Sequence, residues 1–484
     1  MSRFRLVRDF AALSGGELVS KVAGFLAFAY LARVLEPEAY GAVELAAAMA
    51  LFFALVVDFG FGPIGAREIA REPGRAAELA ARVPAGRLLL ALLAFPLMGL
   101  TGLVLGQPPE TVLLIWLFAG SLLFAPWVQR WLLQGLEMMS WVSGAQALRM
   151  VVFAMGVVLF VGGREDLLRV GAIEIGAAAS MALYFAWVQR SRITSLRLSF
   201  RLDGLRKLAR EALPVGVEQL VWALNQYLPT VLVAVLLGGA DLAWFGGAHR
   251  LVLSLGSFVW LYHFNLYPTL ARSTGDGGEA VGALVGPSLR VTAWGSIGLA
   301  LGLALLADPI ARTAFGEAFA SAGLPFAVLI WALPLGLLSG HARFGLIAAG
   351  EQTRELWAQV VGALVTVGVG VAAITALGPV GGAVAMLASN LAVWLVAHRA
   401  MDTHVAAIPF LGPVWRPALW AAALAGGALW FDAPSPWISA PVAGLLFLAG
   451  APLLDRSLLG DLRRLAGAKG GPGTPELAHE GEVR

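Results

Sequence analysis

The chain holds only three lysines, and one of them, Lys21, lies inside a long apolar segment, four residues after Glu17. Residues four apart share one face of a helix, so these two side chains can form an ion pair. A charge at the centre of a membrane span costs about 2.5–3.5 kcal/mol, and such residues usually face a partner or a water-filled cavity. We therefore favour a polar pathway lined by this pair. A self-neutralised pair that only eases membrane insertion is the alternative.

Five further polar residues within apolar segments are candidates for the same cavity. Glu218 and Asn225 are seven residues apart and share one helical face, while Asp58, His249 and Arg250 lie on other segments. Each has an ordinary alternative role. Asp58 can be a helix-packing or capping residue, Asn225 can bridge helices, and Arg250 can snorkel to the membrane interface.

The amino-acid composition indicates that these apolar segments lie in a lipid bilayer. Of the 484 residues, 59% are hydrophobic and only 13% are charged, with a mean hydropathy of +0.78. Apolar runs of about 20 residues recur along the chain, and each is long enough to cross the hydrocarbon core of a bilayer. We expect an all-α integral membrane protein. The absence of cysteine excludes disulfides and thiolate metal sites, and the small net charge of +3 indicates no nucleic-acid partner.

The apolar runs predict fourteen transmembrane helices, an even number that places both termini on one side. Basic residues gather in alternate connections, and the positive-inside rule then makes both termini cytoplasmic, in the cell inner membrane. The opposite connections hold few basic residues. The predicted spans are 12–34, 42–66, 83–106, 111–134, 141–162, 169–189, 213–238, 242–268, 284–307, 322–346, 356–377, 379–398, 413–431 and 436–454.

One connection is longer than the others and divides the chain. Residues 191–212 are basic, with leucines at helical spacing, and predict an amphipathic linker on the inner membrane surface. This gives an N-terminal six-helix lobe and a C-terminal one, followed by two more helices and a cytoplasmic disordered tail. The boundaries are 1–190, 213–400, 411–455 and 456–484.

Motifs for catalysis and nucleotide binding are missing from the sequence. No lysine follows a glycine as a phosphate-binding loop requires, and neither a His-Glu-x-x-His pattern nor clustered histidines predict a metal site. We expect no cofactor and no enzyme activity. A membrane glycosyltransferase, with Glu36 and Glu38 as its acidic residues, is a less favoured alternative because the predicted outer connections are short.

Several motifs, in order, resemble one family. Residues 14–41 include Ser20-Lys21-Val-Ala-Gly24-Phe25 and Leu35-Glu-Pro37-Glu-Ala-Tyr40-Gly41. Further motifs are Pro214-Val-Gly216, Phe245-Gly-Gly-Ala248-His-Arg250, Tyr267-Pro268-Thr-Leu-Ala-Arg272 and Gly378-Pro-Val-Gly381-Gly382-Ala383. Over about residues 10–400 the chain resembles the polysaccharide-synthesis flippases of the multidrug/oligosaccharidyl-lipid/polysaccharide (MOP) exporter superfamily.

The resemblance implies two six-helix lobes in a V around a central cavity, which rock between inward-open and outward-open states. It implies a flippase for a polyprenyl-diphosphate-linked oligosaccharide, for surface or exported polysaccharide. A lipid II flippase is an alternative, although those relatives carry an arginine where this chain has Ala27. A drug or cation antiporter is another, and Lys21 and Arg250 disfavour it.

The resemblance also gives the candidate residues their roles. Lys21 is the best-placed residue for the diphosphate head group, Arg250 is the second, and Glu17 holds Lys21 in place. A proton or sodium ion as coupling ion and a polysaccharide polymerase are candidate partners, besides the substrate and membrane lipids. We expect a monomer.

Overall fold

The structure is a computed structural model that describes residues 3–200, 202–275, 277–430 and 435–467. Within these ranges every regular element is a helix and none is a strand. The expected all-α class is therefore confirmed.

The first group of helices, α1–α8, is called the N-terminal group. Three short 3₁₀ segments, η1 (Pro73–Arg75), η2 (Leu122–Trp127) and η3 (Arg164–Asp166), join some of its members. Its α-helices are α1 (Arg3–Val34), α2 (Pro37–Asp58), α3 (Phe61–Arg71), α4 (Ala76–Val104), α5 (Pro109–Ser121), α6 (Arg130–Gly135), α7 (Met139–Phe160) and α8 (Leu167–Arg192).

The second group, α9–α16, is called the C-terminal group, and three helices follow it. The helices of this group are α9 (Leu202–Leu236), α10 (Gly239–Gly275), α11 (Gly278–Leu305), α12 (Ala307–Phe315), α13 (Gly323–Leu329), α14 (Ala332–Ala348), α15 (Gln352–Leu377) and α16 (Pro379–His404), with η4 (Glu317–Ala322) between α12 and α13. The last three helices are α17 (Trp415–Trp430), α18 (Pro436–Leu454) and α19 (Ser457–Gly467).

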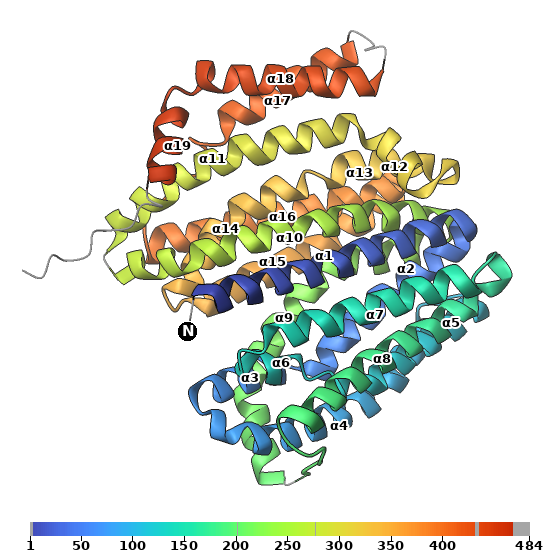
Figure 1. Cartoon of the computed structure of the whole chain (residues 1–484). Helices are drawn as coiled ribbons and strands as arrows, with labels where there is room; N and C mark the ends of the chain where they lie inside the picture. The colour runs from blue at the N-terminus through green and yellow to red at the C-terminus, as the bar shows by residue number, and fades with distance from the viewer. Residues whose placement is uncertain (1–2, 201, 276, 431–434, 468–484) are drawn as a thin grey trace, which may run out of the picture.

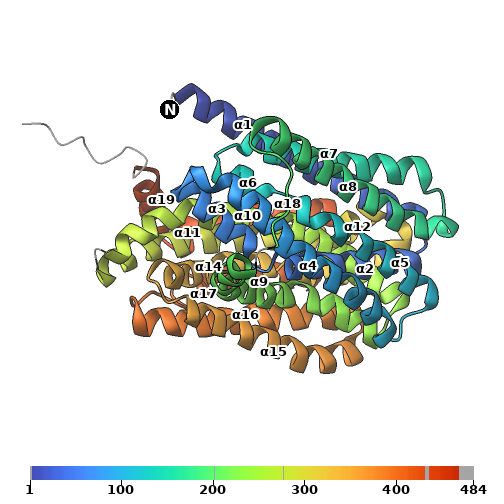
Figure 2. The same cartoon turned by 90° about the horizontal axis from the view of Figure 1, so that it is seen from below.

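The long helices run roughly side by side, and the two groups lie next to each other (Figure 1). Figure 2 shows α7 and α8 on one side of the molecule and α15 and α16 on the other. The groups meet where α2 packs along α9 and α10. We call the end with the chain start and α19 the terminal end, and the end with the turn between α1 and α2 the opposite end.

Eleven helical segments among the described residues are long and apolar enough to cross a membrane. Three further helices, α1, α10 and α17, overlap the predicted spans 12–34, 242–268 and 413–431 without meeting this criterion. The protein is a multi-pass membrane protein, while the count of fourteen spans stays a prediction.

Three predicted spans are interrupted in the structure. Span 42–66 breaks between α2 and α3, where Phe59 and Gly60 adopt left-handed backbone angles with φ of 40° and 76°. Span 111–134 consists of α5, η2 and α6, and span 322–346 changes helix between α13 and α14. Hydropathy measures apolar length and not backbone continuity, which explains why these breaks were missed.

The predicted linker is in part a helix of the bundle. Its second half belongs to α9, a helix of 35 residues that continues through the predicted span 213–238. Leu205 and Leu208 are buried, next to α4 and in a cluster with residues of α3. The face with these two leucines therefore packs on protein, and the position of this stretch on the inner membrane surface stays a prediction.

The predicted disordered tail, 456–484, begins with a helix. In α19, Leu458 and Asp461 are buried, and Asp461 pairs with Arg290 of α11 at 2.8 Å, so disorder was wrong for 457–467. Residues 468–484 lie outside the described residues.

Asp455, just before this helix, has a pKa below its ordinary value. Burial of the carboxyl raises the pKa, but hydrogen bonds from Ser457 and Trp294 outweigh that effect. The positive charges of Arg290 and Arg416 lower the pKa further.

Candidate functional site

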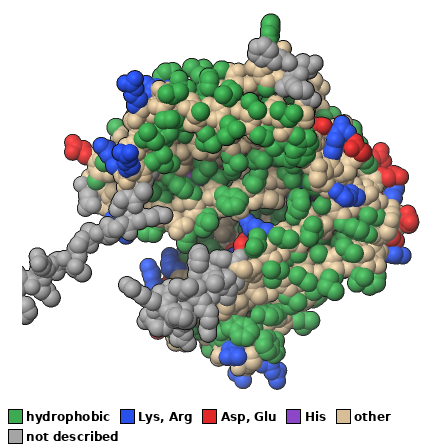
Figure 3. All heavy atoms as spheres, turned by 45° about the horizontal axis from the view of Figure 1, so that its top comes forward, with side chains coloured by type: hydrophobic (Ala, Val, Ile, Leu, Met, Phe, Trp, Pro, Cys, Tyr) green, Lys and Arg blue, Asp and Glu red, His purple; other side chains and the backbone are tan. Residues whose placement is uncertain are grey.

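A cavity of about 480 Å³ lies mainly within the N-terminal group. Side chains of α1, α2, α4–α8 and η2 line it, and α10 contributes Arg250 from the C-terminal group. Its walls are mostly apolar, and four arginines and two acidic residues lie among them: Arg87, Arg130, Arg149, Arg250, Asp58 and Glu174. Figure 3 shows a recess between hydrophobic surfaces, with basic and acidic atoms inside it.

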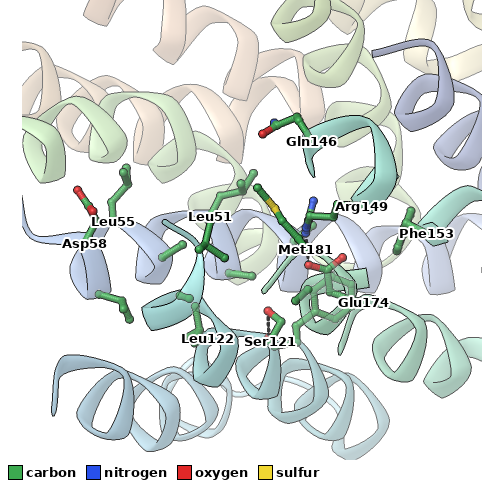
Figure 4. Close-up of a pocket in the computed structure, with 18 of the residues that line it drawn as sticks. Leu51, Leu55, Asp58, Ser121, Leu122, Gln146, Arg149, Phe153, Glu174 and Met181 are labelled. Atoms are coloured by element: carbon green, nitrogen blue, oxygen red, sulfur yellow. Dashed lines mark hydrogen bonds and ion pairs between the residues drawn. The ribbon is translucent and has the colours of Figure 1, made fainter. Parts of the chain in front are cut away.

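Two of these arginines pair with carboxylates of their own group. Arg87 of α4 binds Asp58 at the end of α2 and also donates to the Val128 carbonyl at 3.1 Å. Arg149 of α7 binds Glu174 of α8, and Figure 4 shows the two side chains pointing toward each other across the cavity wall. Both pairs are largely buried, so each carboxylate holds an arginine in place and neutralises it.

Arg250 pairs with a carboxylate of the other group. Its Nε and Nη2 donate to the two oxygens of Glu44 on α2 at 2.6 and 2.8 Å. Its guanidinium carbon lies 3.2 Å from the ring centre of Phe28, which also lines the cavity. This forked geometry is the strong form of the arginine–carboxylate pair.

Arg130 differs from the other three arginines. It is exposed, and among the described residues it has no carboxylate partner. The four arginines, together with Asp58, Glu174 and Glu44, therefore leave the cavity with one positive charge in excess. Arginine forks match the geometry of phosphate oxygens, so this composition suits an anionic ligand.

Glu17 and Lys21 form the expected ion pair, with Lys21 Nζ and a Glu17 carboxylate oxygen 3.8 Å apart. Neither residue lines the cavity. Lys21 lies seven residues before Phe28, which puts both on one face of α1 and about 10 Å apart along its axis. The pair is thus on the cavity side of α1, toward the terminal end, and is 38% and 50% exposed at Lys21 and Glu17.

Of the other expected residues, Asp58 and Arg250 line the cavity, whereas Glu218, Asn225 and His249 do not. The Asn225 amide nitrogen donates to the Gln359 side-chain oxygen at 2.9 Å, and its oxygen accepts from Ser389 at 3.1 Å. Asn225 therefore links α9 to α15 and α16, the alternative that we had given for it. His249 is buried and stacks on Phe245, with ring centres 5.7 Å apart, and Glu218 lies half-buried on α9.

Sequence reasoning missed five charged residues of this site. Glu44, Arg87, Arg149 and Glu174 all lie within predicted spans, and Arg130 lies in the span 111–134. The criterion that selected Lys21, an ionisable residue inside an apolar run, also selects these residues. Among the described residues, no group of three or more histidine, aspartate or glutamate side chains could hold a metal ion.

Comparisons with known proteins identify a family and a fold for the chain. Residues 6–274 match the family model "Polysaccharide biosynthesis protein". No curated protein matches the sequence. Among solved structures, the lipid II flippase MurJ in an inward closed conformation superposes with a TM-score of 0.75, covering 92% of this chain and 99% of that one at 15% identity.

Two other solved structures are more distant. An inward-facing multidrug resistance MATE family transporter of the MOP superfamily gives a TM-score of 0.61, with 86% and 96% coverage and 16% identity. A MOP superfamily transporter from Pyrococcus furiosus, described as having a binding pocket of reverse polarity, gives 0.55, with 88% and 95% coverage and 14% identity. At these identities the likeness shows the fold: that of the MOP superfamily.

Proposed function

Because the chain belongs to the polysaccharide biosynthesis protein family, we propose that it flips a polyprenyl-diphosphate-linked oligosaccharide across the cytoplasmic membrane by alternating access. The observation that carries the proposal is that four arginines line the cavity, against two carboxylates that line it and a third, Glu44, that pairs with Arg250 outside it. A diphosphate bears about two negative charges, and its burial without partners would be costly. Fixed arginines in a region of low dielectric lower that cost.

We propose a separate role for each charged residue in and near the cavity. Arg250, beside the contact with Glu44, and Arg149 would bind the diphosphate, while Arg87 and Arg130, toward the terminal end, would meet an anion on its way in. Lys21, with Glu17, would attract the head group before it reaches the arginines. Asn225 and Glu218 would support this cavity from the C-terminal group, and His249 would pack beneath Arg250.

The arginine excess also bears on the alternative substrates. A cationic drug would meet like charge in this cavity, so we disfavour a drug or cation antiporter. Lipid II carries a diphosphate too, and the cavity suits it equally well.

We assign the protein to the cell inner membrane, with both termini cytoplasmic, and expect it to be a monomer. We propose that a proton or sodium gradient supplies the energy for transport. A polysaccharide polymerase is the partner that we propose.

The proposal is tested by deleting the gene and following the glycan. We expect the surface or exported polysaccharide to disappear while its lipid-linked precursor still forms and accumulates on the inner side. A plasmid copy should restore export. If washed membranes of the deletion strain instead fail to transfer sugar to the lipid, the protein acts in synthesis and the flippase proposal is wrong.

A further inference from the structure

Near the opposite end, α2 and α10 pack against each other with very little space between them. A Cβ atom added at Gly41 would lie 2.8 Å from the Gly239 carbonyl oxygen, and one added at Gly246 would lie 2.7 Å from Glu44 Cγ. Both distances are shorter than side chains allow, so this contact depends on glycine. The contact closes the two helix groups against each other at this end.

The forked pair of Glu44 and Arg250 completes this contact. Glu44 is 6% exposed, and its side chain lies along Gly246 before it reaches the guanidinium. Among the described residues, the other ion pair between the two groups, Arg67–Glu211, is longer at 3.8 Å and more exposed. The Glu44–Arg250 pair is therefore the buried electrostatic link between the groups.

The same arginine also faces the cavity. Arg250 lines it together with Phe28 and Ala47, whereas Glu44 is not among the lining residues. One turn further along α10, Ser254 is exposed, and Phe258 after it is exposed as well. Arg250 thus lies at the boundary between the closed contact and the open part of α10, where an anion in the cavity can reach it.

We propose that the Glu44–Arg250 pair is a latch that holds the opposite end closed, and that an anionic head group releases it by taking Arg250 from Glu44. This identification of the anion rests on the proposed function. Breaking the pair without a replacement would leave a buried unpaired charge, which is strongly unfavourable. Exchange of partner avoids that state, because Arg250 stays paired and separation of the groups gives Glu44 access to water.

A ligand shifts a conformational equilibrium only by binding one state better than the other. A diphosphate meets this condition here. In the closed state Arg250 has its fork occupied by Glu44, and in the open state the fork is free. The anion therefore binds the open state more tightly, and its binding is coupled to opening at the opposite end.

The test measures the distance between the two groups in the full-length protein, in lipid nanodiscs. Glu165→Cys in η3 and Ala318→Cys in η4 place spin labels on exposed sites of the two groups at the opposite end. Since the chain has no cysteine, no native thiol interferes. Without ligand, we expect Glu44→Gln to raise the open-to-closed ratio at least about tenfold, which corresponds to about 1.4 kcal/mol.

Glu174→Gln is the matched control, because it also removes a carboxylate from an arginine of this site but within one group. It should leave the distances unchanged. Equal distributions for Glu44→Gln and Glu174→Gln would overturn the latch. If Glu44→Gln does not fold, the double variant Glu44→Gln/Arg250→Gln replaces it, and it should open to the same extent.

Inorganic diphosphate added to the labelled protein with the native latch tests the exchange. It should lengthen the distance as Glu44→Gln does, and it should have no effect on the double variant. An unchanged distance with bound diphosphate would refute the exchange. These measurements use no glycan, so a failed deletion test would refute the flippase and leave the latch standing.

Discussion

Arg250 and Lys21 are both basic residues within apolar helices, but their contacts differ, and so does the effect on transport that we expect from replacing them. Arg250 is held by two hydrogen bonds to Glu44 and lines the cavity. Lys21 is held by one ion pair of 3.8 Å between partly exposed side chains, and pairs of that kind contribute about 1 kcal/mol or less. The larger effect on transport is therefore expected at Arg250.

We predict that Arg250→Ala lowers glycan export at least about tenfold at unchanged protein level, because losing a buried charge-assisted contact costs about 2–5 kcal/mol. Lys21→Ala should lower export less. The sequence alone led us to the reverse order. The measurement is complementation of the deletion strain, with Arg71→Ala, an exposed arginine of α3, as control. Wild-type export by Arg250→Ala would remove this residue from the pathway.

How far the site could be predicted depends on what each residue contacts. Asp58 and Arg250 were found because a charge in an apolar run is visible in the sequence. Arg149 and Glu174 carry the same signal and were overlooked, but their pairing is not visible, because the two residues lie on different helices and 25 residues apart. Asn225 was also identified from the sequence as a polar residue in an apolar run. Its hydrogen bonds, which join α9 to α15 and α16, depend on how these helices pack and cannot be read from the sequence.

The break between α2 and α3 is the element that shapes the terminal end of the cavity. Gly60 has a φ of 76°, and a Cβ there would lie 2.5 Å from the Ala212 carbonyl oxygen of α9. Phe59 precedes it with a φ of 40°, an unfavourable angle for a bulky residue. Asp58, the last residue of α2, is thereby directed to Arg87.

We predict that Gly60→Ala destabilises the protein by about 1–3 kcal/mol, since it adds both backbone strain and a clash with α9. Thermal unfolding in detergent measures this as a lower midpoint. Gly74→Ala in the nearby η1 segment is the control, because its added Cβ would have nothing within 4 Å. Equal midpoints for the two variants would contradict both the backbone strain at Gly60 and the clash with Ala212.

The helices themselves were largely predictable, and their interruptions were not. Apolar length located α7, α8, α15 and α18 within four residues of their ends, whereas α4, α11 and α16 extend six or seven residues beyond the predicted spans at one end. The break at Phe59–Gly60 depends on contact with α9, more than 150 residues away. The helix α19 depends on Asp461 meeting Arg290, a contact between residues 171 apart. Neither contact leaves a local signal.

At the scale of the whole molecule, basic residues are unevenly distributed between the two ends. The exposed Arg71 lies in the α3 region of the terminal end, whereas Glu165 lies in η3 at the opposite end. The positive-inside rule therefore predicts that the terminal end faces the cytoplasm.

We predict that Glu165→Cys reacts with an impermeant thiol reagent in intact spheroplasts, and that Arg71→Cys reacts only after the membrane is opened. The unsubstituted chain is the blank, because it has no cysteine. Labelling of Arg71→Cys in intact spheroplasts would show that the protein has the opposite orientation in the membrane.

The packing of α2 against the C-terminal group at both its ends, through Gly41 and Gly60, has an electrical consequence. A hydrated passage lined by fixed arginines would conduct small anions if it were open to both sides at once. Each elementary charge that leaks across 100 mV dissipates about 2.3 kcal/mol. In the proposed transport cycle, close contacts at the two ends of α2 would let one end stay shut while the other is open, so that the bilayer remains an insulator.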